Sequence, residues 1–190
     1  MAINPGDVLL DGRVAVVTGG GAGIGRGIAA GFAAFGASVA IWEQNPETCE
    51  AAAAQIGALG LATDVRDGDA VDDALARTTE ELGPVSILVN NAGGVFASPI
   101  LDTTENGWDA LYRANLRHVL LCTQRVARGM VAAGTGGSVT TITSIEGVRA
   151  APGYASYITG QTIHVDGGTH AAGGWYPHPQ TGEYSLGPTD

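Results

Sequence analysis

The sequence predicts an α/β protein built on a doubly wound parallel sheet, and three observations support this fold class. Buried strands alternate with helices across short connections, which is typical of parallel β-α-β units. The first strand runs through glycines directly into a helix. Polar residues recur just past the strands, at the positions where parallel sheets bind ligands. With 190 residues, the chain is long enough for one domain with a substantial core.

A glycine-rich stretch joins the first predicted strand to the first predicted helix. Residues 12–17 are typical of a short buried strand, residues 26–35 have the apolar spacing of a helix, and residues 18–25 lie between them. Such a turn points backbone N–H groups and the helix dipole at an anion, and glycines avoid clashes with it. A turn without a ligand is the alternative, but the flanking strand and helix favour a phosphate-binding cradle. Its candidate cofactor contacts are Gly19, Gly21, Gly23, Ile24 and Gly25.

The second predicted strand, residues 37–42, ends at Glu43. In a dinucleotide site, an acidic residue about 20 residues beyond the glycines accepts hydrogen bonds from the adenosine ribose hydroxyls. Glu43 fits this role, and its charge would repel a 2′-phosphate. No arginine lies between Val39 and Glu50, and Ala22 adds no positive charge to the cradle, so the sequence favours NAD over NADP. The alternative for Glu43 is a solvated carboxylate at a strand end.

The remaining elements continue the alternation as far as residue 143. The sequence predicts helices over residues 46–59 and 67–82, a long helix from a cap at residues 102–105 to about residue 133, and strands over residues 61–65, 85–89 and 137–143. The predicted apolar face of the long helix consists of Trp108, Leu111, Tyr112, Leu116, Val119 and Leu120. Asn115 lies among them, where a satisfied core asparagine is the simplest interpretation. Beyond residue 150 predicted strands and helices no longer alternate, and only residues 161–165 are strand-like.

Four polar residues lie at the carboxyl ends of predicted strands: Thr18, Glu43, Asp64 and Asn91. The carboxyl ends of parallel strands meet at one edge of the sheet, and ligands bind beyond that edge. We therefore expect these four residues to surround one ligand site.

Composition and charge exclude several classes of function. The formal net charge of −10 argues against non-specific nucleic-acid binding and against an anionic membrane surface. Without a signal segment or an apolar run that could span a bilayer, the sequence is typical of a soluble, cytoplasmic protein. Cys49 and Cys122 are predicted to be reduced, buried thiols, and no metal site is expected from the cysteine and histidine spacing. All nine basic residues are arginines, so the chain contains no lysine.

Several motifs, in this order, resemble the short-chain dehydrogenase/reductase family. They are Thr18-Gly19-x-x-x-Gly23-Ile24-Gly25, Asp64-Val65, Asn90-Asn91-Ala92-Gly93, Asn115, Ser144 and Val165-Asp166-Gly167-Gly168. The resemblance covers residues 8 to about 157 almost continuously, and then residues 156–168. It implies a Rossmann-like fold and NAD(P)-dependent hydride transfer between a secondary alcohol and a ketone. The cofactor contacts that it implies are Asp64, Val65, Asn91, Ala92 and Gly93.

The resemblance also implies which residues carry the chemistry. The family's serine, which hydrogen-bonds the substrate oxygen, corresponds to Ser144, and its asparagine, which holds a water of the proton relay, corresponds to Asn115. The family's tyrosine, which exchanges a proton with the substrate, is expected thirteen positions after the serine, at Tyr157. The lysine that lowers the pKa of this tyrosine should follow four residues later, where the chain has Gln161.

The difference from the family is larger than one substitution, because residues 157–161 resemble the segment leading into the family's last strand. The active-site helix, the sixth strand and the substrate lid have no counterpart, so the C-terminal half of the fold is predicted to be incomplete. We expect one dinucleotide-binding domain, residues 1–168, and a Gly-, Pro- and aromatic-rich tail, residues 169–190. The family forms homo-oligomers, but the loss of an interface helix argues against a native tetramer. The alternatives to an active oxidoreductase are a non-catalytic dinucleotide-binding protein and an inactive deletion form.

Overall fold

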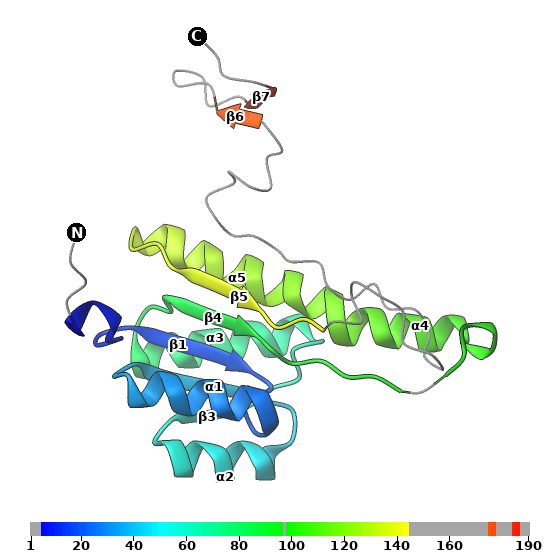
Figure 1. The fold of residues 1–190 in the computed structure, drawn as a ribbon, viewed down its shortest axis with the longest axis horizontal. Coiled ribbons are helices and arrows are strands. Elements are labelled where there is room, and N and C mark those ends of the chain that lie inside the picture. The colour runs from blue at the N-terminus through cyan, green and yellow to red at the C-terminus, as the bar shows by residue number, and fades with distance from the viewer. Residues whose placement is uncertain (1–4, 97, 145–174, 178–183, 187–190) are drawn as a thin grey trace.

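A five-stranded parallel sheet forms the centre of the molecule (Figure 1). The computed structural model describes residues 5–96, 98–144, 175–177 and 184–186. The strands lie in the order β3-β2-β1-β4-β5 and are β1 (Val14–Thr18), β2 (Ser38–Glu43), β3 (Leu59–Ala62), β4 (Ile87–Asn90) and β5 (Ser138–Thr141). The helices are α1 (Gly23–Ala34), α2 (Pro46–Ile56), α3 (Gly68–Leu82), α4 (Glu105–Tyr112) and α5 (His118–Ala133), with 3-10 turns η1 (Pro5–Val8) and η2 (Ile100–Asp102).

Helices cover both faces of this sheet, and the winding direction changes between β1 and β4. On one face, α1 and α2 pack against the strands through Ala29 and Cys49. On the other face, α3 and α5 pack through Val71 and Val126. The strand order therefore reverses between β1 and β4, which is where open sheets of this kind bind ligands. The predicted fold class, an α/β protein with a doubly wound parallel sheet, is confirmed.

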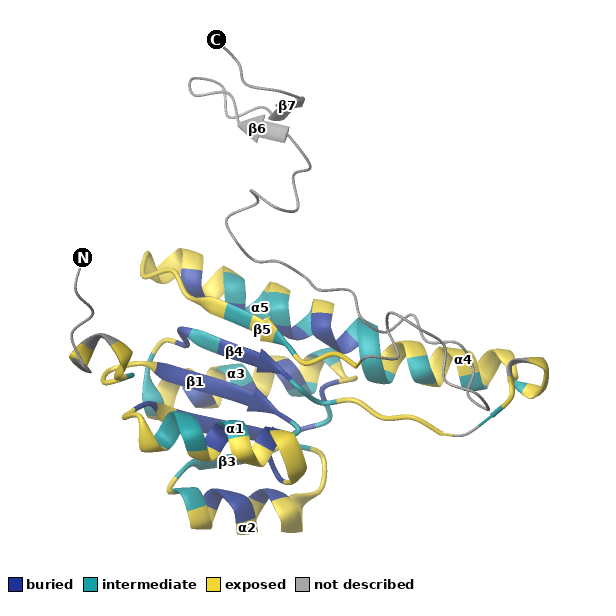
Figure 2. Cartoon of the chain, in the orientation of Figure 1, coloured by how far each residue is buried: buried dark blue, intermediate teal, exposed yellow. Residues whose placement is uncertain are grey.

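The inner strands are the most deeply buried part of the molecule (Figure 2). All residues of β1, from Val14 to Thr18, are buried. In β2, Trp42 is fully buried despite its size, and its indole N–H has a partner. Trp42 Nε1 donates a hydrogen bond to Thr78 Oγ1 (3.1 Å), and this hydroxyl donates to the carbonyl oxygen of Ala74 (2.7 Å). The polar atom of the largest core side chain is therefore satisfied inside the core.

Several element boundaries differ from the sequence prediction by a few residues, and two of these differences have a clear local cause. α2 ends before residue 59 because Gly57 adopts a left-handed conformation, with a φ of 75°. β3 ends at Ala62 rather than at residue 65 because the chain turns there. In that turn, Oδ1 of Asp64 accepts a hydrogen bond from the backbone N–H of Arg66 (3.0 Å). Asp64 therefore lies in the connection after β3.

The predicted long helix is divided by a wider turn. Residues Arg113–Arg117 form a π-helix, η3, between α4 and α5. A π turn holds more residues than an α turn, so it changes the direction in which the following side chains point. The predicted apolar face is wrong for Trp108, Tyr112 and Leu120, which are 39%, 46% and 52% exposed. The buried face of α5 instead consists of His118, Val119, Cys122, Val126 and Met130.

Within the described part of the chain, β5 is an edge strand and pairs only with β4. Its residues Ser138 and Thr140 are exposed, which distinguishes it from the buried strands β1 and β4 (Figure 2). Cys49 and Cys122 are free and buried, as predicted. Among the described helices, none combines the length and the apolar character needed to cross a lipid bilayer.

The tail contains two short strands that the sequence prediction missed. β6 (Trp175–Pro177) and β7 (Tyr184–Leu186) pair in antiparallel orientation. Strands of three residues are too short for a period-2 pattern to be recognised in a sequence. The strand predicted over residues 161–165 and the domain boundary at residue 168 lie outside the described residues, and both stay predictions.

Replacing Thr78 by valine tests the hydrogen bond that satisfies Trp42. Thr78→Val keeps the shape of the side chain but leaves the buried indole N–H without an acceptor. We expect the free energy of unfolding, measured with urea, to fall by about 1–3 kcal/mol.

Thr79→Val is the matched control for this substitution. The Thr79 hydroxyl also donates to a carbonyl oxygen one turn earlier, that of Leu75 (2.8 Å), but it is exposed. Its loss should change the free energy of unfolding by no more than about 0.5 kcal/mol. Equal losses in the two variants would contradict a special contribution from the buried hydroxyl.

Candidate functional site

The turn between β1 and α1 brings three backbone segments into close contact. Gly19 has a φ of 63°, and a Cβ atom there would lie 3.0 Å from the Cα atom of Ala92. A Cβ atom on Gly25 would overlap the carbonyl oxygen of Gly19 and the side-chain amide of Asn91. Glycine is therefore required where the end of β1, the first turn of α1 and the loop after β4 meet.

Hydrogen bonds hold the same junction together. Thr18 is fully buried, and its Oγ1 accepts hydrogen bonds from the backbone N–H groups of Asn91 (2.9 Å) and Ala92 (3.0 Å). The same hydroxyl donates to the carbonyl oxygen of Val89 (3.3 Å). Asn91 Nδ2 in turn donates to the carbonyl oxygens of Thr18 (2.9 Å) and Gly19 (3.2 Å). The carboxyl ends of β1 and β4 are thereby fixed relative to each other.

The Glu43 carboxylate lies against the glycine turn. Its Oε2 accepts a hydrogen bond from the backbone N–H of Gly21 (3.2 Å), and its Oε1 accepts one from Asn45 (3.0 Å). Gly21 is buried, and a Cβ atom on it would lie 2.6 Å from Glu43 Cγ. The structure thus brings together the two features that the sequence analysis connected, the glycine turn and the acidic end of β2.

The N-terminus of α1 differs from the N-termini of α2, α3 and α4. Ala22, its N-cap residue, makes no side-chain hydrogen bond, whereas side chains cap α2, α3 and α4. Within the described part of the chain, the first N–H groups of this 12-residue helix therefore have no side-chain acceptor. Gly23 (φ 52°) and Ile24 (66% exposed) form this first turn. Uncapped N–H groups beside a glycine turn are the arrangement that binds a phosphate group.

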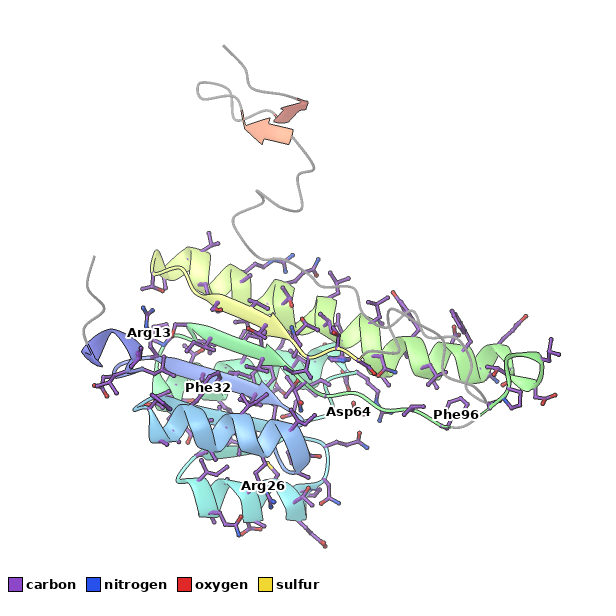
Figure 3. The ribbon with its side chains drawn as sticks, viewed as in Figure 1. Arg13, Arg26, Phe32, Asp64 and Phe96 are labelled. Carbon is purple, nitrogen blue, oxygen red and sulfur yellow. The ribbon has the colours of Figure 1, made fainter. Side chains whose placement is uncertain are left out.

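A cavity of about 300 Å³ opens beyond the carboxyl ends of β1, β2, β3 and β4. Its lining includes these predicted cofactor residues: Gly19, Glu43, Asp64, Val65, Asn91, Ala92 and Gly93. Figure 3 shows Asp64 at the edge of the sheet where β1 and β4 end. Four chain segments that are distant in sequence thus contribute to a single site. Of the four strand-end residues, Glu43, Asp64 and Asn91 line the cavity, whereas Thr18 is fully buried and is not among the described lining residues.

Asp64 is held by a residue that the sequence analysis did not single out. The Arg66 guanidinium contacts both carboxylate oxygens, with Nε 2.8 Å from Oδ1 and Nη2 2.7 Å from Oδ2. These hydrogen bonds lower the pKa of Asp64, so its side chain is ionised at neutral pH. The signal available in the sequence was the position of Arg66, two residues beyond the strand-end aspartate.

Side chains of the π-helix form hydrogen bonds with two loops that line the cavity, the loop after β4 and the loop after β3. Asn115 Nδ2 donates hydrogen bonds to the carbonyl oxygens of Gly94 (2.8 Å) and Leu111 (2.9 Å), and its Oδ1 accepts one from the Gly94 N–H (3.1 Å). Arg117 Nη1 donates to the carbonyl oxygen of Arg66 (2.8 Å). The amide of Asn115 is thus satisfied, and it holds the loop after β4 while Arg117 holds the loop after β3.

His118 is a second residue that sequence reasoning missed. It is 1% exposed, and within the described part of the chain neither of its ring nitrogens forms a hydrogen bond. Burial lowers the pKa of His118 to about 4, and the nearby backbone of Ala92 offsets only part of this effect. His118 is therefore neutral at pH 7 and packs behind the cavity wall. Its position three residues after Asn115 gave no recognisable signal.

The structure describes two of the three predicted catalytic residues, Asn115 and Ser144. Asn115 is half-buried behind the cavity, and Ser144 is exposed and follows the end of β5. Tyr157 and Gln161 lie outside the described residues. The predicted roles of Asn115, Ser144 and Tyr157 therefore stay predictions.

Comparison with known proteins shows to which protein family this chain belongs. A family model described as short chain dehydrogenase matches residues 13–161. The chain belongs to the short-chain dehydrogenase family. It is 39% identical over 142 residues to a sorbitol dehydrogenase of Cereibacter sphaeroides and 37% identical over 153 residues to a gluconate 5-dehydrogenase of Gluconobacter oxydans.

The aligned regions cover 74% and 78% of this chain but only 56% and 59% of those two short-chain dehydrogenases. The chain thus spans little more than half the length of its relatives, which agrees with the predicted incomplete C-terminal half.

The chain likewise matches only part of the length of similar solved structures. A short-chain dehydrogenase/reductase from Mycobacterium marinum matches with a TM-score of 0.75 and 33% identity, over 77% of this chain and 62% of that chain. A 7α-hydroxysteroid dehydrogenase complexed with NADH and 7-oxo glycochenodeoxycholic acid matches with a TM-score of 0.76 and 32% identity, over 82% and 63%.

Gly25→Ala tests the close packing at the junction of β1, α1 and β4. The added methyl group would force the Gly19 carbonyl and the Asn91 side chain apart. We expect the free energy of unfolding to fall by about 1–3 kcal/mol, as is usual for overpacking. Urea unfolding measures the change.

Gly27→Ala, on the same helix, is the control. Nothing lies within 4 Å of a Cβ atom there, so alanine should stabilise α1 by about 0.5–1 kcal/mol. If Gly25→Ala were also stabilising, the junction would not be packed as described.

Proposed function

We propose that this protein is an oxidoreductase that interconverts a secondary alcohol and a ketone by hydride transfer with a nicotinamide dinucleotide, with NAD favoured over NADP. The main observation in support of this proposal is the cavity at the carboxyl edge of the sheet. There the glycine turn, Glu43 and Asp64 follow one another across β1, β2 and β3. This order suits a pyrophosphate, a ribose with free hydroxyls and a base, respectively.

The residues of the site fit such a dinucleotide. The uncapped start of α1 offers N–H donors to phosphate oxygens, and Gly19, Gly21 and Gly25 keep the turn free of side chains that would fill it. The Glu43 carboxylate can accept hydrogen bonds from ribose hydroxyls and would repel a 2′-phosphate. When bound, the nicotinamide accepts or supplies the hydride. Small polyols are the first substrates to test, because two relatives are named for sorbitol and gluconate.

A specific observation favours a second candidate, a non-catalytic dinucleotide-binding protein. The chain contains no lysine, and Gln161 stands where the family's lysine is expected. An unperturbed tyrosine has a pKa of about 10, so ionising Tyr157 at pH 7 would cost about 4 kcal/mol. Proton transfer by a tuned group contributes about 10²–10⁴-fold to the rate, and much of this would be lost.

Separate measurements of binding and turnover distinguish the two candidates. NADH binding is followed by nicotinamide fluorescence, and NAD reduction is assayed with secondary alcohols that include sorbitol. We expect micromolar-range NADH binding and slow turnover of at least one alcohol. Binding without turnover would select the non-catalytic candidate, and the absence of NADH binding would contradict both.

Glu43→Gln tests the cofactor preference. Removing the negative charge should strengthen NADPH binding by about tenfold, because a like-charge repulsion of about 1.4 kcal/mol is relieved. NADH binding should weaken, since an amide is a poorer acceptor for ribose hydroxyls than a carboxylate.

Glu50→Gln makes the same change of charge on the exposed surface of α2 and serves as the control. Its ratio of NADH to NADPH dissociation constants should equal that of the unmodified protein. A parallel shift in both variants would assign the preference to overall charge rather than to Glu43.

A further inference from the structure

A second cavity lies beside the first, between the connection from β3 to α3 and the segment formed by α4 and the π-helix. It has a volume of about 500 Å³, which is within the usual range for small-molecule sites. Asp64 and Arg66 line both cavities, so the two share one wall. We call the second one the arginine cavity. Its lining includes Asp64, Arg66, Asp67, Ala110, Arg113 and Arg117.

The arginine cavity gathers positive charge in an acidic chain. Three of the nine arginines line it, whereas the formal net charge of the whole sequence is −10. Two aspartates face these three arginines. Positive charge that is gathered in a cleft raises the local concentration of anions. An anion is therefore the kind of ligand that this cavity favours.

Two of the three arginines have no carboxylate partner within the described part of the chain. Asp64 is paired with Arg66 (Nη2 to Oδ2, 2.7 Å), and the Asp67 side chain caps α3. Arg117 Nη1 donates to the carbonyl oxygen of Arg66 (2.8 Å), and the exposed Arg113 side chain donates to none of the described residues. Each guanidinium has five N–H donors, so Arg113 and Arg117 together keep most of theirs for a ligand.

The same two arginines lie close together in the chain. Both belong to the π-helix and line the same cavity, so their charges repel each other. An anion between them would remove this repulsion. Arg117 is half-buried and already held by its hydrogen bond, so it would lose little side-chain freedom when a ligand binds.

The lining also indicates the chemistry of the ligand. A guanidinium matches the oxygens of a phosphate group in a two-pronged contact, and a phosphate ester carries close to two negative charges at pH 7. One such group suits the two unpaired arginines. The remaining volume is bordered by the carboxylates of Asp64 and Asp67, which accept hydrogen bonds, and Ala110 is the only described lining residue with an apolar side chain. Hydroxyl groups fit this part of the cavity better than an apolar group.

We propose that the arginine cavity binds a small phosphate ester that carries hydroxyl groups, with Arg113 and Arg117 on the phosphate. The site is distinct from the glycine turn at the start of α1, where the phosphates of a dinucleotide are proposed to bind. It requires neither a bound dinucleotide nor catalysis.

The test measures binding of glycerol 3-phosphate to the full chain by isothermal titration calorimetry, with inorganic phosphate and glycerol as comparisons. We expect glycerol 3-phosphate to bind at least about threefold more tightly than inorganic phosphate, because its hydroxyls add hydrogen bonds, and glycerol to give no binding. Arg113→Gln should weaken binding of the ester by about tenfold, since charge-assisted hydrogen bonds are lost. R113K should give an intermediate value, because lysine keeps the charge but cannot form the two-pronged contact.

Two control variants show where the ester binds. R128Q removes another exposed arginine, on α5, and should change the dissociation constant by less than about twofold, since a distant exposed charge is screened by salt. A22D places a carboxylate at the uncapped start of α1, which would exclude phosphate there, and should leave binding in the arginine cavity unchanged.

Three results would overturn the proposal. Equal losses in R113Q and R128Q would assign binding to overall charge, and a loss in A22D without one in R113Q would assign it to the glycine turn. If glycerol 3-phosphate did not bind, or bound no better than inorganic phosphate, the cavity would not be a site for a hydroxylated ester. Thermal unfolding of each variant shows that a loss of binding is not a loss of the fold.

Discussion

The close contact of Gly19, Gly25 and Asn91 is the constraint on which the rest of the site depends. β1 and β4 are neighbours in the sheet, but the chain leaves them toward opposite faces, so a crevice forms between their connections. The buried Thr18 hydroxyl and the Asn91 amide bridge this crevice with hydrogen bonds. Once this junction is fixed, the parallel registers from β1 to β2 and from β2 to β3 place Glu43 and the turn after β3 at the same edge.

The residues proposed to bind a nucleotide and those predicted to transfer a proton lie in different parts of this chain. Among the described residues, those that line the cavity all lie at or before Ala114, within the segment that also forms the buried centre of the sheet. Ser144 and Tyr157, which the family resemblance connects with proton transfer, come later in the sequence. The geometry of the cavity can therefore persist when the catalytic groups change. This separation explains why a dehydrogenase and a binding protein are both consistent with the same cradle.

Local signals were sufficient to predict most of the fold and the strand-end residues of the cavity, whereas Val65, Ala92 and Gly93 came from the family resemblance. Glycine turns, strand-end carboxylates and helix caps act over a few residues, so a sequence displays them directly. The π-helix could not be predicted, because it accompanies contacts between distant segments: Asn115 reaches Gly94, 21 residues away, and Arg117 reaches Arg66, 51 residues away. The burial of His118 follows that wide turn and was hidden for the same reason. The predicted apolar face is confirmed at Val119 but wrong at Leu120, because it assumed a single helical period across the turn.

The π-helix at Arg113–Arg117 also limits how this protein can change in length during evolution. One residue corresponds to a rotation of about 100° around a helix axis. Losing a residue here would either pull Asn115 away from Gly94 or turn the apolar side of α5, including Val126 and Met130, away from the sheet. Insertions and deletions should therefore accumulate in surface connections and be excluded from this segment. The structure therefore constrains the number of residues in this segment more than the identity of any one side chain in it.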